Sequence, residues 1–371
     1  MNARAKSSRW LSVALISAAL GIVNGGAIGA EVGSGRDVLD QPAKHSDRAK
    51  SAMLTAVAVA GKRLVAVGER SIVLLSDDNG ESWRQARTVP TSVALTAVRF
   101  VSETVGWAVG HSGVVLKTTD GGETWERQLD GKRAAAIELA AAEAAAGGSA
   151  TPNRRMRDAQ GLVADGADKP FLDVYFFDQQ HGFVVGAYGL AFATRDGGKT
   201  WSSLVGQIDN PKSRHLYHVA VADKYLLIAG EQGNLLRSAD GGQHFSSIVV
   251  NYPGTLFGAV QAEDSSLVVF GLRGNAFRST DQGSTWSKVD FGLPVTLTAG
   301  IRMRDGRLAV VDEAGRLLLS NDAGASFASV ANIKMNSATG LVEAADGAIV
   351  VSTQRGAVRI APEALRAEQK K

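Results

Sequence analysis

A short turn motif recurs six times along this chain and constrains its fold more than any other feature. Its pattern is Ser/Thr-x-Asp-x-Gly-x-(mostly Ser/Thr)-Trp/Phe, and four of the six Trp residues stand at its last position. An Asp carboxylate in such a turn can accept backbone N–H groups of the same turn, and Gly allows a backbone shape that a side chain would obstruct. We therefore expect a structural role for the motif aspartates, which are Asp78, Asp120, Asp196, Asp240, Asp281 and Asp322.

Each motif closes a longer repeat. Successive motif aspartates lie 41–44 residues apart, except for one gap of 76 residues. An apolar strand, a Gly-x-x-Gly turn and a second apolar strand precede the motif, as in AVGHSGVVLKT. Four short strands in such a period are typical of a β-propeller. A seventh unit, Gly340–Pro362, has the early strands without the motif, so the sequence predicts an all-β fold of seven blades.

The repeats place the propeller at about residues 51–362, followed by a polar tail at 363–371. Two interpretations remain open for the polar segment 31–50. It is either a disordered leader, or Arg36–Pro42 supplies the outer strand that the seventh repeat lacks, because a blade without that strand leaves a bare sheet edge. Ring closure favours the second. The blades are expected to begin near Ala52, Val93, Phe171, His215, Thr255, Val295 and Gly340.

The first 30 residues have the pattern of a signal peptide. Arg4, Lys6 and Arg9 precede the apolar run WLSVALISAALGIV, and small residues follow up to Gly29 and Ala30. We expect a soluble, monomeric protein exported to a periplasm or lumen. Without this peptide the chain has as many basic as acidic residues, which gives no support to nucleic-acid binding. With no Cys, a disulfide or a lipid-bearing thiol is excluded.

An insertion at 130–169 separates the second and third blades. Ala134–Ala146 has a helix-forming composition, and the basic run NRRMRD follows it. The insertion is either a mobile loop with one helix or an arm that reaches over the binding face.

Catalytic and metal-binding patterns are incomplete. The stretch GHSG fails the nucleophile motif Gly-x-Ser-x-Gly because Val114 occupies the fifth position. His215 and His218 are expected on opposite faces of a strand, which argues against a shared metal ion. We therefore predict no metal site, and with these motifs incomplete we also predict no cofactor and no catalytic residue. A glycosidase needs two carboxyl groups in one cleft. The candidates for that alternative are Asp173, Asp264, Asp312 and Glu313.

Propeller topology separates the chain's turns onto two faces. The six aspartate motifs should share one face, and the Gly-x-x-Gly turns and the insertion the other. The tips of the Gly-x-x-Gly turns vary in sequence, and loops on a rigid scaffold commonly carry binding residues. The simpler alternative is that each tip is a solvated turn. The predicted binding residues on the insertion face are Arg70, His111, Tyr188, Gln232, Arg273 and Arg355.

The unit GWAVGHSGVVLKTTDGGETW (Gly106–Trp125) closely resembles the photosystem II stability/assembly factor family, and its turn is similar to the Asp box of bacterial neuraminidase repeats. The resemblance covers about residues 54–361, apart from the insertion. It implies an exported, non-enzymatic propeller that acts as an assembly factor or scaffold and binds a protein partner at or near a membrane. The alternative is a carbohydrate-active propeller, either a glycoside hydrolase similar to a sialidase or a xyloglucanase, or a glycan-binding protein.

Overall fold

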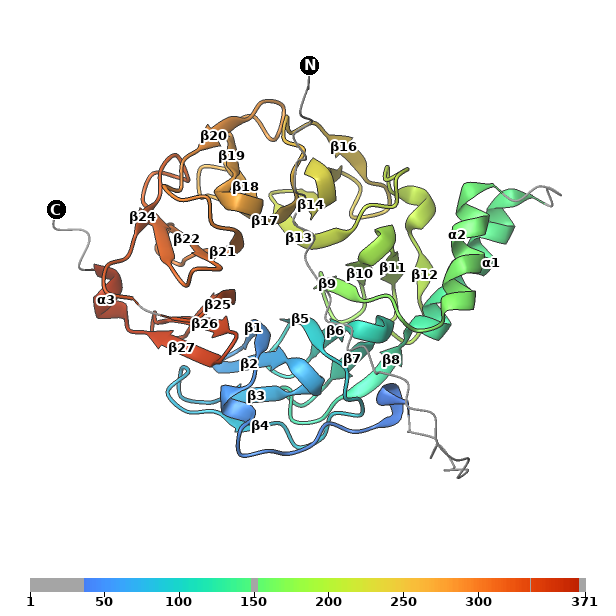
Figure 1. The fold of residues 1–371 in the computed structure, drawn as a ribbon, viewed down its shortest axis with the longest axis horizontal. Helices are drawn as coiled ribbons and strands as arrows, with labels where there is room; N and C mark the ends of the chain where they lie inside the picture. Colours follow the sequence, from blue (N-terminus) through green and yellow to red (C-terminus); the bar gives the residue numbers. More distant parts are fainter. Residues whose placement is uncertain (1–36, 148–152, 334, 367–371) are drawn as a thin grey trace, which may run out of the picture. The chain divides into compact units, whose positions relative to one another are not determined.

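The computed structural model describes residues 37–147, 153–333 and 335–366; the predicted signal peptide and the end of the tail lie outside them. Seven antiparallel sheets stand around a central channel (Figure 1), which confirms the predicted seven-bladed propeller. Each sheet is built from one continuous stretch of chain, and its first strand lies nearest the channel. Blade by blade, the strands are β1 (Leu54–Ala60), β2 (Arg63–Gly68), β3 (Val73–Ser76), β4 (Arg84–Gln85); β5 (Leu95–Phe100), β6 (Gly106–Gly110), β7 (Val115–Thr118), β8 (Glu126–Leu129); β9 (Phe171–Phe176), β10 (Gly182–Gly186), β11 (Ala191–Thr194), β12 (Ser202–Ser203); β13 (Leu216–Ala222), β14 (Tyr225–Gly230), β15 (Leu235–Ser238), β16 (Ser246–Ile248); β17 (Leu256–Gln261), β18 (Leu267–Gly271), β19 (Ala276–Ser279), β20 (Ser287–Val289); β21 (Leu297–Arg302), β22 (Leu308–Asp312), β23 (Leu317–Ser320), β24 (Ala328–Ser329); and β25 (Ala338–Glu343), β26 (Ile349–Thr353), β27 (Gly356–Ile360).

The core lies between neighbouring blades. The cluster between blades 1 and 2, for example, packs Val65 and Leu75 against Leu95 and Leu116, all of them almost fully buried. Burying one such side chain stabilises the fold by about 1.5–3 kcal/mol. The apolar faces of adjacent sheets therefore hold the ring together.

Each first strand has a bulge at its second residue, and in some blades a Thr at the bulge adds a polar link to the neighbouring blade. Thr55 occupies this position in blade 1, and its hydroxyl donates to the Leu95 carbonyl of blade 2 at 2.7 Å. Thr96 donates in the same way to the Phe171 carbonyl of blade 3 at 2.7 Å. Blades 3, 4 and 5 lack this hydrogen bond from a Thr hydroxyl to the next blade, because the residues at the bulge are Leu172, Tyr217 and Phe257.

The expectation that Arg36–Pro42 closes the seventh blade is wrong. Blade 7 has three strands, and Val38–Asp40 form a 3₁₀ turn capped by Asp37. This segment instead lies along blades 1 and 2, because the buried Leu39 joins their core. The ring closes by direct packing of β25 on β1, helped by a 2.9 Å hydrogen bond from the Thr339 hydroxyl to the Leu54 carbonyl.

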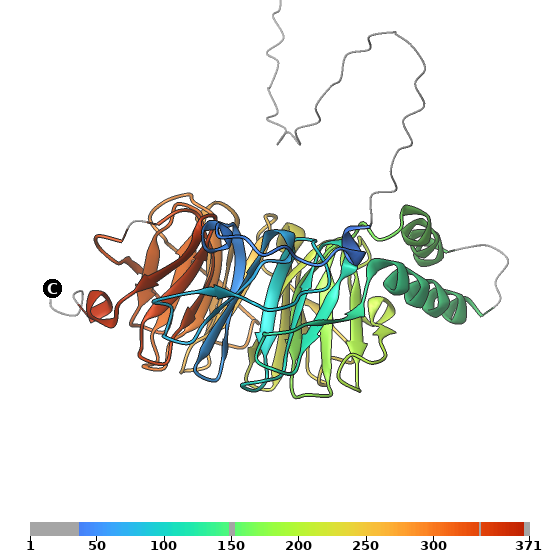
Figure 2. The same ribbon diagram turned by 90° about the horizontal axis from the view of Figure 1, so that it is seen from below.

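The insertion forms two helices where the sequence predicted one. They are α1 (Gly131–Ala146) and α2 (Arg154–Asp165), and both lie beside the outer edge of the ring (Figures 1 and 2). The buried Glu138 of α1 accepts hydrogen bonds from Arg155 of α2 and from Ser203 of β12. The helices are thus docked on blade 3, and they leave the channel mouth uncovered. A third helix, α3 (Pro362–Arg366), begins the predicted tail.

Candidate functional site

The Asp-box turns satisfy their own polar groups. In blade 3, Asp196 accepts the Thr200 N–H at 2.9 Å and the Thr200 and Thr194 hydroxyl groups at 2.6 and 2.9 Å. These bonds lower the pKa of Asp196 to about 2, the Thr200 hydroxyl having the largest effect. Asp78 and Asp281 have equivalent bonds and the same pKa. The arrangement is that of a structural turn.

Cations on the Asp-box face bind neighbouring blades. Arg63 of blade 1 donates to the Gly121 carbonyl in the box of blade 2 at 3.1 Å, and Lys117 of blade 2 donates to the Gly197 carbonyl of blade 3 at 2.9 Å. Two later junctions repeat the contact at the same box position. Their donors and acceptors are Arg237 with the Gln282 carbonyl and Arg278 with the Ala323 carbonyl.

The box aromatics vary in burial. Trp125 and Trp201 are buried, and the indole N–H of each donates to the carbonyl of the box Gly. Trp286 makes the same bond but is only half-buried. The repetition of Trp at this position predicts burial in every such box, and Trp286 departs from that prediction.

All six predicted binding residues are exposed at turns that join second and third strands, on the face that also carries the link containing the insertion. Four of them share an unusual backbone: Arg70, Tyr188, Gln232 and Arg273 have φ between 52° and 57°. This left-handed conformation is uncommon for residues other than Gly and costs roughly 1–2 kcal/mol. In the turn of blade 2 the left-handed residue is Ser112, and His111 precedes it directly in the chain. Arg355 precedes a left-handed Gly356 in blade 7.

Glutamates at the first position of these turns face their own blades. Glu69 accepts the Met53 N–H at 3.1 Å, Glu231 the His215 N–H at 3.2 Å, and Glu313 the Thr296 N–H at 3.2 Å. Each bond fixes the start of a first strand. The backbone therefore binds these glutamate side chains, whereas the side chains of Arg70, Arg273 and Arg355 form no hydrogen bond with the residues that the structure describes.

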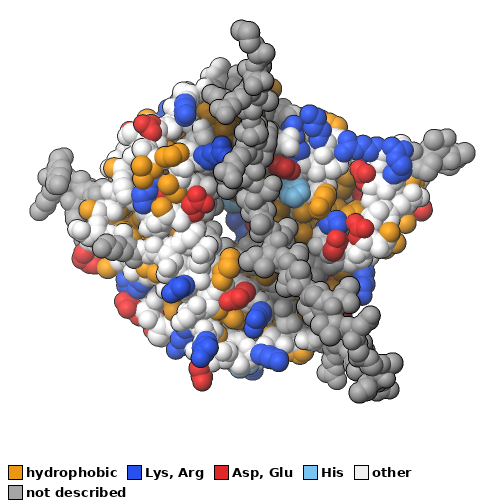
Figure 3. All heavy atoms as spheres, viewed as in Figure 1, with side chains coloured by type: hydrophobic (Ala, Val, Ile, Leu, Met, Phe, Trp, Pro, Cys, Tyr) orange, Lys and Arg blue, Asp and Glu red, His pale blue; other side chains and the backbone are white. Residues whose placement is uncertain are grey.

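Arg70, Arg273 and Arg355 form no ion pair with any residue that the structure describes. Figure 3 shows this face with its basic side chains spread around the central opening. Arg70 and Arg355 belong to the adjacent blades 1 and 7, and Arg273 belongs to blade 5. The face thus presents separated, unpaired cations.

Sequence reasoning missed a row of rings on the same face. The ring centroids of Tyr188 and His215 lie 5.0 Å apart, those of His215 and Tyr217 6.1 Å, and those of Tyr217 and Phe257 5.0 Å. Burial, with a smaller effect of Glu231, raises the pKa of Tyr217. Alignment of the first strands would have identified part of the row, because Tyr217 and Phe257 replace the bulge Thr of other blades.

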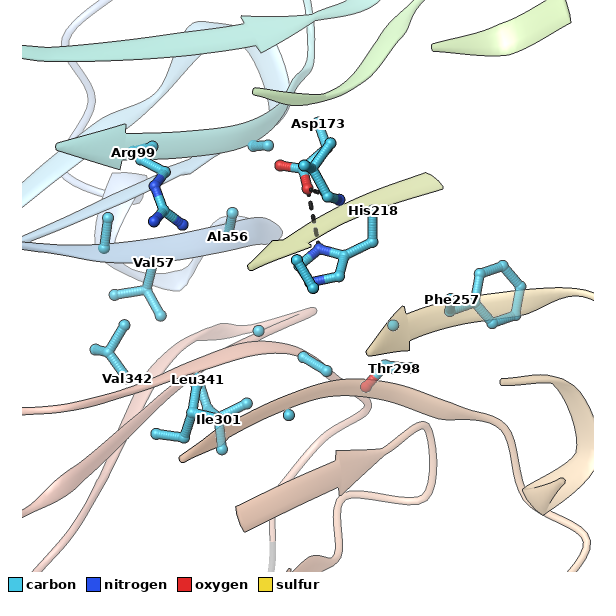
Figure 4. Close-up of a pocket in the computed structure, with 18 of the residues that line it drawn as sticks. Ala56, Val57, Arg99, Asp173, His218, Phe257, Thr298, Ile301, Leu341 and Val342 are labelled. Atoms are coloured by element: carbon cyan, nitrogen blue, oxygen red, sulfur yellow. Dashed lines mark hydrogen bonds and ion pairs between the residues drawn. The ribbon is translucent and has the colours of Figure 1, made fainter. Parts of the chain in front are cut away.

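The channel holds one carboxylate in its described lining. Asp173 faces His218, with Oδ2 2.9 Å from Nδ1 (Figure 4), and it also accepts the Val219 N–H at 2.8 Å. This carboxylate thereby links blade 3 to blade 4.

The four glycosidase candidates do not meet in one cleft. Asp264 pairs with Arg278 at 3.2 Å, and the fully buried Asp312 pairs with Arg316 at 2.6 Å. Asp173 lies in the channel, and Glu313 serves its own turn. The paired carboxyl groups that glycoside hydrolysis needs are not assembled among these residues.

Two further observations concern the described part of the chain. It contains no group of three or more His, Asp or Glu residues placed to hold a metal ion. None of its helices is long and apolar enough to cross a bilayer.

These features define an Asp-box propeller. One of its faces is built from turns that satisfy their own polar groups, and the other carries exposed basic side chains. The chain belongs to the family described as "Photosynthesis system II assembly factor YCF48", whose profile matches residues 162–357. A curated relative, "Photosystem II assembly lipoprotein Ycf48" of Synechococcus sp. (strain CC9902), is 32% identical over 80 residues, 22% of this chain. The match spans only about a quarter (24%) of that relative's length.

Two solved propellers share the fold. One, described as "YCF48 bound to D1 peptide", has a TM-score of 0.61 and 16% identity, and the match covers 84% of this chain and 94% of that one. The other, YCF48 from Cyanidioschyzon merolae, has a TM-score of 0.59 and 15% identity, with 87% and 99% covered.

Proposed function

We propose that this protein is a non-enzymatic scaffold, similar to the photosystem II assembly factors, which binds an acidic segment of a membrane-associated protein. The observation that carries the proposal is the asymmetry of charge on the insertion face. Its turn glutamates are bound by backbone N–H groups, and Arg70, Arg273 and Arg355 remain without acidic partners in the described structure. An acidic polypeptide would supply those partners.

The relatives support this class of function. The family is described as an assembly factor, and one solved relative is described as bound to a D1 peptide. We extend to this chain the binding of a peptide from such a membrane protein, by way of Arg70, His111, Tyr188, Gln232, Arg273 and Arg355. The signal-like start of the sequence supports export to a periplasm or lumen, where the mature chain would act as a monomer.

The test is capture of partner proteins from membrane extracts by the mature protein. One variant combines Arg70→Gly, Arg273→Gly and Arg355→Gln. Gly suits the left-handed backbone at the first two positions, so the fold should persist. Its control combines Gln282→Gly, which has a left-handed φ of 59° on the Asp-box face, with Lys199→Gln.

We expect the first variant to lose capture and the control to retain it. Removing a residue that anchors an interface costs about 2 kcal/mol or more, and capture by the unmodified protein should weaken with salt. Capture that survives the first variant and fails in the control would show that the partner binds the Asp-box face.

A further inference from the structure

A cleft separates helix α2 from blade 3 and from the link to blade 4. Its volume is about 360 Å³. Leu162 of α2, Leu190 of blade 3, and Val205 and Ile208 of the link form apolar parts of its wall. Arg154 bridges one side by donating to the Pro211 carbonyl at 2.6 Å. A space of this size and lining accommodates an apolar side chain.

The walls of the cleft are held in place. The guanidinium of Arg155 lies on the carboxylate of the buried Glu138, with Nε 2.7 Å from Oε1. The Ser203 hydroxyl donates to the same carboxylate. Truncating one partner of such a pair leaves a buried charge, which is strongly unfavourable. These contacts hold the two insertion helices against blade 3 and thereby fix the position of the cleft walls.

Tyr188 connects the cleft with the channel. It lines the cleft, it is 55% exposed, and its ring begins the row that continues through His215 to Tyr217 and Phe257. The last two residues line the channel. Rings spaced 5–6 Å apart offer an extended chain a continuous apolar surface.

Charges of both signs lie beside this track: Asp158 and Asp209 line the cleft, and two cations follow the cleft residues Pro211 and Ser213 in the chain. Lys212 is exposed and forms no ion pair with the described residues. The Nε–H of Arg214, which follows the cleft residue Ser213, is buried and has no hydrogen-bond partner in the described structure. Lys212, which is exposed, is the cation beside the cleft that an acidic chain can reach.

We propose that this track binds an extended acidic polypeptide and that the cleft selects an apolar side chain from it. The inference rests on the proposed function, because it assigns a subsite to the same partner. The insertion then contributes selectivity, and the arginines of the turns contribute charge attraction that does not depend on the apolar residue.

Three short synthetic peptides test the proposal. They have the same background of alternating glycine and aspartate and differ only in a central leucine, phenylalanine or serine. We expect the leucine and phenylalanine peptides to bind the mature protein about tenfold more tightly than the serine peptide, as burial of a large apolar side chain predicts. Fluorescence anisotropy measures the affinities.

Asp158→Trp fills the cleft from α2, and Tyr188→Gly removes the ring at its mouth. Among the described residues Asp158 makes one ion pair, an exposed one with Arg154, so its loss should leave the fold intact. Gly at residue 188 suits the left-handed backbone. The matched controls are Gln160→Trp on the same helix and Gln282→Gly, at a residue with a left-handed φ of 59° on the Asp-box face.

Both cleft variants should reduce the preference for leucine over serine to less than about twofold, with the controls keeping the tenfold ratio. The combined arginine variant should weaken all three peptides alike and leave the ratio unchanged. Equal binding of the leucine and serine peptides by the unmodified protein, or an unchanged ratio in both cleft variants, overturns the cleft proposal. If the arginine variant still loses partner capture, the proposed function stands without the cleft.

Discussion

The two faces of the ring use charge in opposite ways. On the Asp-box face, cations such as Arg63 and Lys117 donate to the next blade, and the box carboxylates serve their own turns. On the insertion face the glutamates are engaged, and Arg70 and Arg273 extend from a strained backbone without an ionic partner among the described residues. The Asp boxes thus bind their own carboxylates, whereas the turns of the insertion face leave Arg70 and Arg273 available to a second molecule.

The largest effect should come from an aromatic of the Asp-box face. Trp201 is 8% exposed, it meets Phe176 edge-to-face at 6.3 Å, and its indole N–H donates to the Gly198 carbonyl at 3.0 Å. Trp201→Ala should lower the free energy of unfolding by about 3–5 kcal/mol, measured by denaturant titration. Trp286→Ala should cost less, because Trp286 is half-buried. Equal losses would contradict this view of the two sites.

The next effect concerns the box carboxylate itself. Asp196→Ala removes the acceptor of three hydrogen bonds and should cost about 1–3 kcal/mol of unfolding free energy. Asp196→Asn keeps one acceptor oxygen and should cost less. Glu231→Ala tests the comparison on the insertion face, where one bond at 3.2 Å is lost and the cost should be about 1 kcal/mol.

Low pH should destabilise the protein through the aspartates of the Asp boxes. The pKa of Asp78, Asp196 and Asp281 is lowered from 3.8 to about 2 in the folded protein, with side-chain hydrogen bonds as the largest cause. A lowered pKa means that this stabilisation is fully present above about pH 4–5 and lost as the pH falls towards 2. The melting temperature should therefore be flat from pH 7 to 5 and fall below pH 4. The Asp196→Asn variant should show a shallower fall; a steeper one would contradict the assignment.

A small effect is expected at the left-handed turns. Arg273→Gly removes a side chain and relieves the backbone at φ 57°, while it adds freedom to the unfolded chain. The two effects oppose each other, so the unfolding free energy should change by less than about 1 kcal/mol. Arg273→Val should destabilise the protein, because a β-branched residue fits this conformation poorly. If Gly proves as costly as Val, the side chain has a structural role on this face.

Removal of metal ions should have the smallest effect. The boxes are closed by their own hydroxyl and N–H groups, so EDTA should leave the melting temperature unchanged. A fall of several degrees that calcium reverses would show that the box aspartates act as ligands.

The repeat period predicted the fold well because each blade is specified locally. Every box, strand pair and Gly-x-x-Gly turn follows from residues within one repeat, and the first strands start within a few residues of the expected positions. The segment before blade 1 was harder to predict, because its course depends on the packing of Leu39 into the core between blades 1 and 2. The second insertion helix was missed because its basic run gave no apolar stripe; only Met156 and Ala159 are buried.

For the candidate site, topology predicted the face but not its detailed contacts. That Arg70 and Arg273 are exposed follows from strand order alone. The engagement of Glu69 and Glu231 by backbone could not be predicted, because it depends on where the preceding first strand begins in space. The cleft beside α2 was equally hidden, since it requires the contact between Glu138 and Arg155.

The closure of the ring without a shared strand has a consequence for folding. Every sheet is contributed by one continuous segment, so all strand pairing joins residues that are near in sequence, and such short loops close quickly. Blade 1 can form as soon as its residues are available, and each later blade can add to the edge of a growing stack. The single long-range step is the meeting of β25 with β1. Under the export that we propose, this order would let folding advance with translocation, and only the final step would wait for the end of the chain.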